Sequence, residues 1–129
     1  MDQQLQPPRL FATENLPVIA TVTEGYKRWH GTLPHMARLT RYSLGQHIDG
    51  LFIRLLEAIL AAGFAERAHK PECLEKASVT LDCLKLFLQV AWELKAIDNK
   101  AFANVGGPLV EAGKMLGGWK KQVSKTPPL

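Results

Sequence analysis

The chain has 129 residues, of which 47% are hydrophobic and 22% charged, with a formal net charge of +4. This length suits one domain, and the high apolar content with charges of both signs excludes a wholly disordered chain. The positive charge favours an acidic partner such as nucleic acid, although many small basic proteins bind none.

Residues 1–12 are predicted to form a flexible N-terminal arm, because the first eight are polar and end in two prolines. This arm has no apolar stretch of the kind found in a signal peptide. The longest apolar stretch, Leu51 to Ala65, is interrupted by charged residues and is too short to span a bilayer. We therefore expect a cytoplasmic protein without a membrane partner.

Prolines and one aspartate mark the predicted helix ends. Pro17 suits the first turn of a helix that continues to about Leu33, and Pro34 lies at or just after its end. Pro71 suits the start of the third helix, and Asp98 is placed to cap the fourth.

Each predicted helix carries apolar residues at spacings of three and four, which is typical of a helix that faces a core. The spacings predict core positions at Val18, Val22, Tyr26, Trp29 and Leu33; at Leu44, Ile48, Leu51, Leu55, Ile59 and Ala62; at Leu74, Ala77, Leu81, Leu84, Leu88 and Ala91; and at Val105, Leu109, Ala112, Leu116 and Trp119. No alternating strand pattern is present. The predicted fold class is all-α, an antiparallel up-down four-helix bundle over residues 13–123, followed by a flexible tail over 124–129.

The second and third helices carry more apolar surface than one bundle can bury. No helix is central in a four-helix bundle, so a second interface is needed to cover the surplus. We therefore predict a homo-oligomer. Its interface residues are expected to be Ile53, Leu56, Leu60, Phe64, Phe87, Val90 and Leu94.

The sequence offers no convincing active site, metal site or cofactor site. Its histidines follow no HxxxH or HExxH pattern, and its paired glycines lack the strand and lysine of a phosphate loop. Cys73 and Cys83 lie ten residues apart in one predicted helix, about 15 Å, which is too far for a disulfide. We expect free thiols in a reducing compartment and no enzymatic activity.

Basic residues are the candidates for a nucleic-acid-binding surface. On the fourth helix, Lys114, Lys121 and Lys125 follow one stripe opposite the core position Leu116. A purely solvated surface is the alternative for these charges. The full candidate set is Lys27, Arg28, Arg38, Arg41, Arg54, Lys114, Lys120, Lys121 and Lys125.

Glycines form a second stripe on the fourth helix, at Gly106, Gly113 and Gly117. Because each glycine in a helix costs about 1 kcal/mol relative to alanine, a stripe of them indicates close approach of another group. Close packing within the bundle or at a subunit contact is favoured over contact with a ligand. Pro108 interrupts the same helix and is expected to remove one hydrogen bond and to introduce a kink.

Two runs carry a family resemblance. Residues 41–46, at the expected start of the second helix, read RYSLGQ, and residues 113–119 read GKMLGGW. In this order and at this separation they resemble the accessory variability determinant (Avd) family of diversity-generating retroelements. The similarity covers roughly residues 13 to 123. The interruption at residues 106–108 departs from the family, in which this stretch is usually charged.

The resemblance implies a bundle that assembles into a barrel-like pentamer and has no catalytic activity of its own. It also implies association with the retroelement's reverse transcriptase and binding of RNA or DNA through a basic exterior. Such a protein supports mutagenic cDNA synthesis and retrohoming. Arg41, Lys114, Gly117, Gly118 and Trp119 match motif positions, and we interpret Trp119 as a packing residue before a ligand-stacking one.

The same superfamily includes proteins encoded in intervening sequences of ribosomal RNA genes. The alternative function is therefore an oligomeric protein-interaction module without a reverse transcriptase partner.

Overall fold

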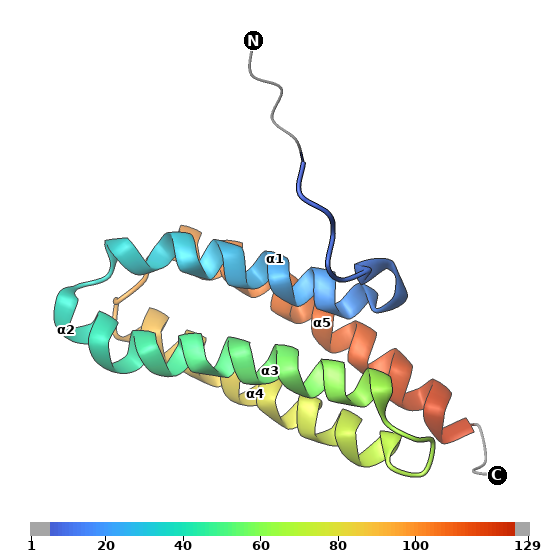
Figure 1. Ribbon diagram of the computed structural model, residues 1–129. Coiled ribbons are helices and arrows are strands. Elements are labelled where there is room, and N and C mark those ends of the chain that lie inside the picture. Colours follow the sequence, from blue (N-terminus) through green and yellow to red (C-terminus); the bar gives the residue numbers. More distant parts are fainter. Residues whose placement is uncertain (1–5, 126–129) are drawn as a thin grey trace.

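The computed structural model describes residues 6–125, which contain four long helices and no strand (Figure 1). The long helices are α1 (Pro17–Thr32), α3 (Gln46–Phe64), α4 (Lys70–Glu93) and α5 (Asn99–Lys125). The all-helical class predicted from the sequence is confirmed. Helix α1 packs against α3 and α5, and α4 packs against the same two helices. The connections alternate between the two ends of the bundle along the chain.

Short helical turns join α1 to α3. They are η2 (Leu33–His35), α2 (Arg38–Thr40) and the π-helical turn η3 (Arg41–Gly45), which runs directly into α3. A further short turn, η1 (Thr13–Asn15), precedes α1. The second helical segment thus begins at Arg38, before the predicted start at Arg41, because Arg41 N–H already donates to the carbonyl of Ala37 at 2.8 Å.

The predicted helix ends are largely confirmed. Pro17 and Pro71 occupy the first turns of α1 and α4, where a missing N–H leaves no helical hydrogen bond unmade. Asp98 Oδ1 accepts a hydrogen bond from the N–H of Ala101 at 2.7 Å, as an N-cap does. Helix α5 continues through Pro108 and ends at Lys125, slightly beyond the predicted bundle boundary at residue 123.

Residues 6–12 are exposed and lie outside any helix. The flexibility predicted for residues 1–5 and 126–129 concerns positions outside the described residues.

Lys70 ties three helices together at one end of the bundle. Its Nζ donates to the carbonyls of Ala62 at 2.8 Å and Gly63 at 3.4 Å, in the last turn of α3. A cation is favourable there because the helix C-terminus carries a partial negative charge. The same ammonium lies 5.7 Å from the centre of the Trp119 ring on α5.

The predicted apolar stripes form the core. Every predicted core position is buried except Tyr26, Leu33, Leu44 and Trp119, which are partly buried and pack against the core. Phe52 was not among the predicted positions, yet it is fully buried and stacks on Trp29 with ring centroids 6.4 Å apart.

Within residues 6–125, no helix combines the length and the apolar character that crossing a bilayer requires.

Candidate nucleic-acid interface

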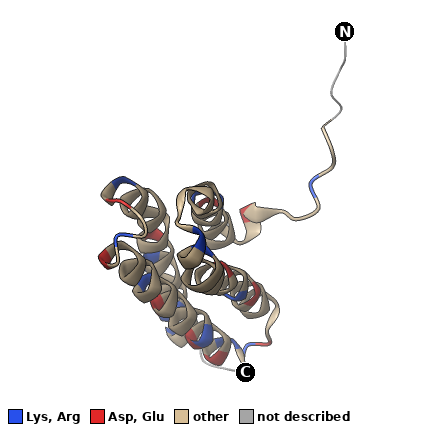
Figure 2. Ribbon diagram, turned by 90° about the vertical axis from the view of Figure 1, so that its left-hand side faces the viewer, with Lys and Arg blue, Asp and Glu red and all other residues tan. Residues whose placement is uncertain are grey.

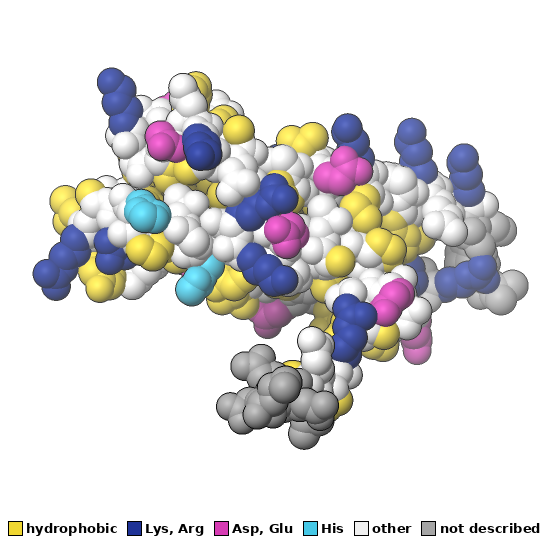
Figure 3. Space-filling model, turned by 90° about the horizontal axis from the view of Figure 1, so that it is seen from above, with side chains coloured by type: hydrophobic (Ala, Val, Ile, Leu, Met, Phe, Trp, Pro, Cys, Tyr) yellow, Lys and Arg dark blue, Asp and Glu magenta, His cyan; other side chains and the backbone are white. Residues whose placement is uncertain are grey.

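The lysine stripe of α5 faces solvent. Lys114, Lys121 and Lys125 are exposed, and none forms an ion pair with another residue of the described range. Their spacing places them on one side of the helix, opposite buried Leu116. In the view from above, several basic side chains project from one long edge of the molecule (Figure 3). These three lysines are therefore sterically available to an anionic partner.

The glycines of α5 fall into two groups. A Cβ added at Gly113 would lie 2.9 Å from Lys85 Nζ and 3.6 Å from Leu81 Cδ2, so this glycine permits close packing against α4. At Gly106 and Gly117 an added Cβ would meet no described atom within 4 Å. Close packing within the bundle is thus confirmed for Gly113. Gly106 and Gly117 face open space in the single chain, and for them a subunit contact stays a prediction. The neighbouring Gly107 and Gly118 are equally open.

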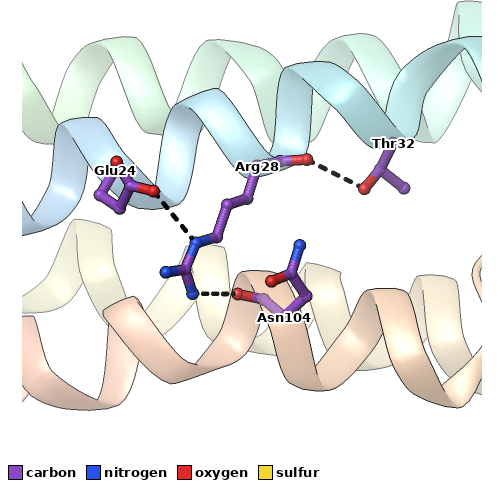
Figure 4. A network of polar contacts seen from close by, with 4 residues as sticks. All are labelled: Glu24, Arg28, Thr32 and Asn104. Atoms are coloured by element: carbon purple, nitrogen blue, oxygen red, sulfur yellow. Dashed lines mark hydrogen bonds and ion pairs between the residues drawn. The ribbon is translucent and has the colours of Figure 1, made fainter.

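Arg28 is engaged within the bundle (Figure 4). Pro108 has no N–H, so the carbonyl of Asn104 lacks the helical donor that it would normally receive four residues later. Arg28 Nη1 donates to this carbonyl at 3.0 Å, while Nε lies 3.3 Å from the carboxylate of Glu24. Arg28 therefore supplies the donor that Pro108 removes, and it joins α1 to α5.

The other candidate cations are either paired within the bundle or exposed without an ion-pair partner among the described residues. Lys120 forms an ion pair with Glu75 at 2.7 Å, which joins α5 to α4. Lys27 on α1 and Arg54 on α3 are exposed and have no ion-pair partner within the described range.

Arg38 and Arg41 lie in the connection between α1 and α3. Arg41 Nη2 donates to the carbonyls of Pro34 at 3.1 Å and Met36 at 2.9 Å, so its guanidinium holds the chain reversal in place. Arg38 is exposed, and its guanidinium carbon lies 5.9 Å from the centre of the Tyr42 ring. Of the two, Arg38 is the more accessible to a phosphate.

Sequence reasoning did not select Asp49, which belongs with these residues. Burial raises the pKa of Tyr26, and the hydrogen bond and charge of Asp49 raise it further. Asp49 follows Arg41 and Gly45 at successive intervals of four residues, which place all three on one side of the helix. From that spacing, the sequence could have placed Asp49 beside Arg41 and Gly45.

Charge is not separated onto two sides of the molecule. Figure 2 shows acidic and basic positions distributed together over the helices. Surface charges at such spacing interact weakly with one another and are screened by salt. Positive potential therefore depends on local groupings such as the lysine stripe of α5.

The predicted interface residues are unequally exposed. Ile53, Leu60, Phe64 and Leu94 are exposed, with Phe64 at 78%. Leu56, Val90 and Phe87 are partly buried, and Phe87 lies edge-on to His47 at 4.5 Å between α3 and α4. Three further exposed apolar residues of α4, absent from the predicted set, are Val79, Leu86 and Trp92.

The described residues contain no group of three or more His, Cys, Asp or Glu side chains that could hold a metal ion. Cys73 and Cys83 are free thiols, as predicted, and both are partly buried on α4.

Comparisons of the chain with family models, with curated proteins and with solved structures found no match. The functional argument therefore uses the two sequence runs and their places in the structure. The run at 113–119 lies within α5 and contains both the buried Leu116 and the exposed Lys114. The run at 41–46 forms the π-helical turn and the first residue of α3.

Proposed function

We propose that this chain is a non-catalytic accessory protein of a diversity-generating retroelement, which binds RNA or DNA through the lysine stripe of α5. The observation that carries the proposal is that Lys114, Lys121 and Lys125 share one exposed side of a helix and have no ion-pair partner among the described residues. The RYSLGQ and GKMLGGW runs support the choice of family. Chemistry on the nucleic acid belongs to a partner reverse transcriptase, whose mutagenic cDNA synthesis and retrohoming the protein supports.

We further propose that the chain is an antiparallel up-down bundle that self-associates, as a barrel-like pentamer. The exposed apolar side chains of α3 and α4 support this, because soluble monomers rarely expose so many large apolar residues together. Repetition around a ring would also turn three lysines per chain into a continuous positive surface. Binding would then be salt-sensitive and weakly sequence-specific.

Titration of labelled single-stranded RNA and DNA over a salt series tests the binding proposal. Lys114→Gln/Lys121→Gln should weaken binding and reduce the slope of log K against log salt by about 1 per lysine. The matched control is Lys76→Gln/Lys95→Gln, which removes the same charge from α4 and the turn after it. Equal losses in both variants, or no binding at low salt, would contradict the assignment.

Co-purification with the reverse transcriptase of a diversity-generating retroelement tests the partner. Light scattering at micromolar concentration tests self-association, and a strictly monomeric mass would refute it. If charge reversal at Lys114 and Lys121 leaves function intact, a merely solvated basic surface is favoured. Absence of co-purification favours the alternative, an interaction module without a reverse transcriptase partner.

A further inference from the structure

A pocket of about 250 Å³ opens between α1 and the start of α3, and its lining residues are far in sequence from the lysine stripe. Its polar and aromatic lining consists of Tyr26, His30, Arg41, Tyr42, Gln46 and Asp49. Three of these residues belong to the RYSLGQ run. A run that carries the family resemblance therefore also lines a pocket.

The π-helical turn and one glycine shape this pocket. A π-helical turn inside an α-helix is rare and occurs frequently at functional sites. Gly45, which also lines the pocket, is buried in this turn. A Cβ there would lie 3.3 Å from Leu33 Cδ2 and 3.5 Å from the carbonyl oxygen of Thr40. The absence of a side chain therefore lets η2 and η3 close together beneath the pocket.

Two opposite charges at the pocket do not neutralise each other. Arg41 Nε and Asp49 Oδ1 are both buried without a hydrogen-bond partner among the described residues. Arg41 and Asp49 form no ion pair with each other within the described chain, although both line the pocket. A buried polar atom left unsatisfied is destabilising, so a ligand toward which the two side chains turn, offering an acceptor to Arg41 and a donor to Asp49, would remove that cost.

The positions of these two groups are fixed. Arg41 Nη2 is held by the carbonyls of Pro34 and Met36, as described above. Asp49 lies beside the Tyr26 hydroxyl, which stays protonated at neutral pH because burial and the carboxylate raise the pKa of Tyr26. These contacts keep both residues at the pocket, so little reordering is needed to bring their unpaired atoms to a ligand.

Aromatic rings form a further part of the lining. Tyr26 and His30 lie edge to face with centroids 6.3 Å apart, and Tyr42 is 59% exposed at the pocket. The Arg38 guanidinium adjoins the Tyr42 ring and adds positive charge at the rim. Single-stranded nucleic acids are commonly recognised by stacking of unpaired bases on Tyr or His and by hydrogen bonds to the base edges.

The charge pair narrows the choice of ligand. A phosphate or carboxylate offers acceptors only and leaves Asp49 unpaired, and a simple cation leaves Arg41 unpaired. Guanine satisfies both groups, because its adjacent N1–H and N2–H donate to a carboxylate while O6 and N7 accept from a guanidinium. No other standard base presents two adjacent donors beside an acceptor.

We propose that this pocket binds one unpaired guanine of a single-stranded nucleic acid, with Asp49 on its N1–H and N2–H edge, Arg41 on its acceptor side and Tyr42 against its ring. The inference rests on the proposed function, since it requires that the chain bind nucleic acid. It adds a preference for one base to a contact that the lysine stripe alone would make without regard to sequence.

Fluorescence anisotropy with labelled uridine oligonucleotides that carry one central G, A, C or U tests the inference at fixed salt. The single-G oligonucleotide should bind roughly 5- to 150-fold more tightly than the others. Asp49→Asn, which keeps the shape of the side chain, should abolish that preference. Asp82→Asn, at an exposed position of α4, is the matched control and should retain the preference.

Two variants of Tyr42 provide a test that does not depend on folding, because this side chain is mostly exposed and its replacement should leave the core intact. Tyr42→Ala should lose the preference for guanine, whereas Tyr42→Phe should keep it. Salt-dependent binding that is equal for all four oligonucleotides would overturn the guanine inference and leave the proposed function standing. Absence of binding to every oligonucleotide at low salt would overturn both. Guanosine monophosphate that binds as tightly as the single-G oligonucleotide would show a mononucleotide site instead, and would also overturn the inference.

Discussion

Replacing Arg28 by methionine tests whether this arginine repairs the break that Pro108 makes in α5. Methionine keeps the aliphatic stem of the side chain and removes its donors. The variant loses the hydrogen bond from Nη1 to the Asn104 carbonyl and the contact between Nε and Glu24. The first bond matters because Pro108 cannot donate to the same carbonyl.

The expected loss follows from these two contacts. A hydrogen bond from a charged donor contributes roughly 1.5–3 kcal/mol, and the exposure of Asn104 to water reduces this to about 1 kcal/mol. The Glu24 pair adds about 0.3 kcal/mol, because the side chains are 39% and 50% exposed. In a Pro108→Ala background, the new alanine has a backbone N–H that can donate to the Asn104 carbonyl. There, Arg28→Met should cost only about 0.3 kcal/mol, the contribution of the Glu24 pair.

Urea unfolding of the four proteins of this double-mutant cycle, followed by far-UV circular dichroism at one protein concentration, measures the coupling. The free energies of unfolding should give a coupling of about 1 kcal/mol between positions 28 and 108. The cycle cancels the separate effects of Pro108→Ala on packing and helix propensity. If Arg28→Met costs the same in both backgrounds, the repair argument is refuted.

Three pairs of substitutions test packing and capping through the free energy of unfolding. Trp29→Phe should cost less than half of the roughly 3–5 kcal/mol expected for Trp29→Ala. Phenylalanine keeps most of the buried ring and removes an indole N–H that has no partner among the described residues. Similar losses in the two variants would contradict this. Gly25→Ala should destabilise the fold, since its Cβ would lie 3.3 Å from Pro108 Cβ. Gly117→Ala should stabilise the monomer by about 1 kcal/mol, because its Cβ meets open space. Effects of the same sign at the two sites would refute the distinction. Asp98→Ala should cost about 1 kcal/mol through loss of the N-cap, and Asp98→Asn much less; equal losses would show that the cap hydrogen bond is not the cause.

The helices and their buried sides were predictable because both follow from local spacing. Apolar residues three and four positions apart identify the buried side without knowledge of the neighbouring helix. Pro17 and Asp98 act on their own helices, so their roles are legible from the sequence alone. Phe52 was missed because α3 packs against both α1 and α4, which widens its buried arc beyond a single stripe.

The hydrogen bonds and ion pairs of the basic residues were less predictable, because long side chains reach across to other helices. A helical wheel places Arg28 and Lys120 on outward or lateral positions but gives no information on Asn104 or Glu75, which lie on neighbouring helices. One signal was available for Arg28. A proline within a helix leaves a carbonyl without its donor, and a cation on the adjacent helix is a suitable replacement.

The single ammonium of Lys70 links the ends of three helices, and this has a mechanical consequence for the lysine stripe. Lys70 fastens the last turn of α3 through two carbonyls and lies against Trp119, two residues before Lys121 on α5. We therefore expect tension applied to the end of α5, for example by a polymer on the lysine stripe, to reach the turn between α3 and α4. Amide hydrogen exchange in the last turn of α3 should report an event on α5, although the two segments are more than fifty residues apart in the chain.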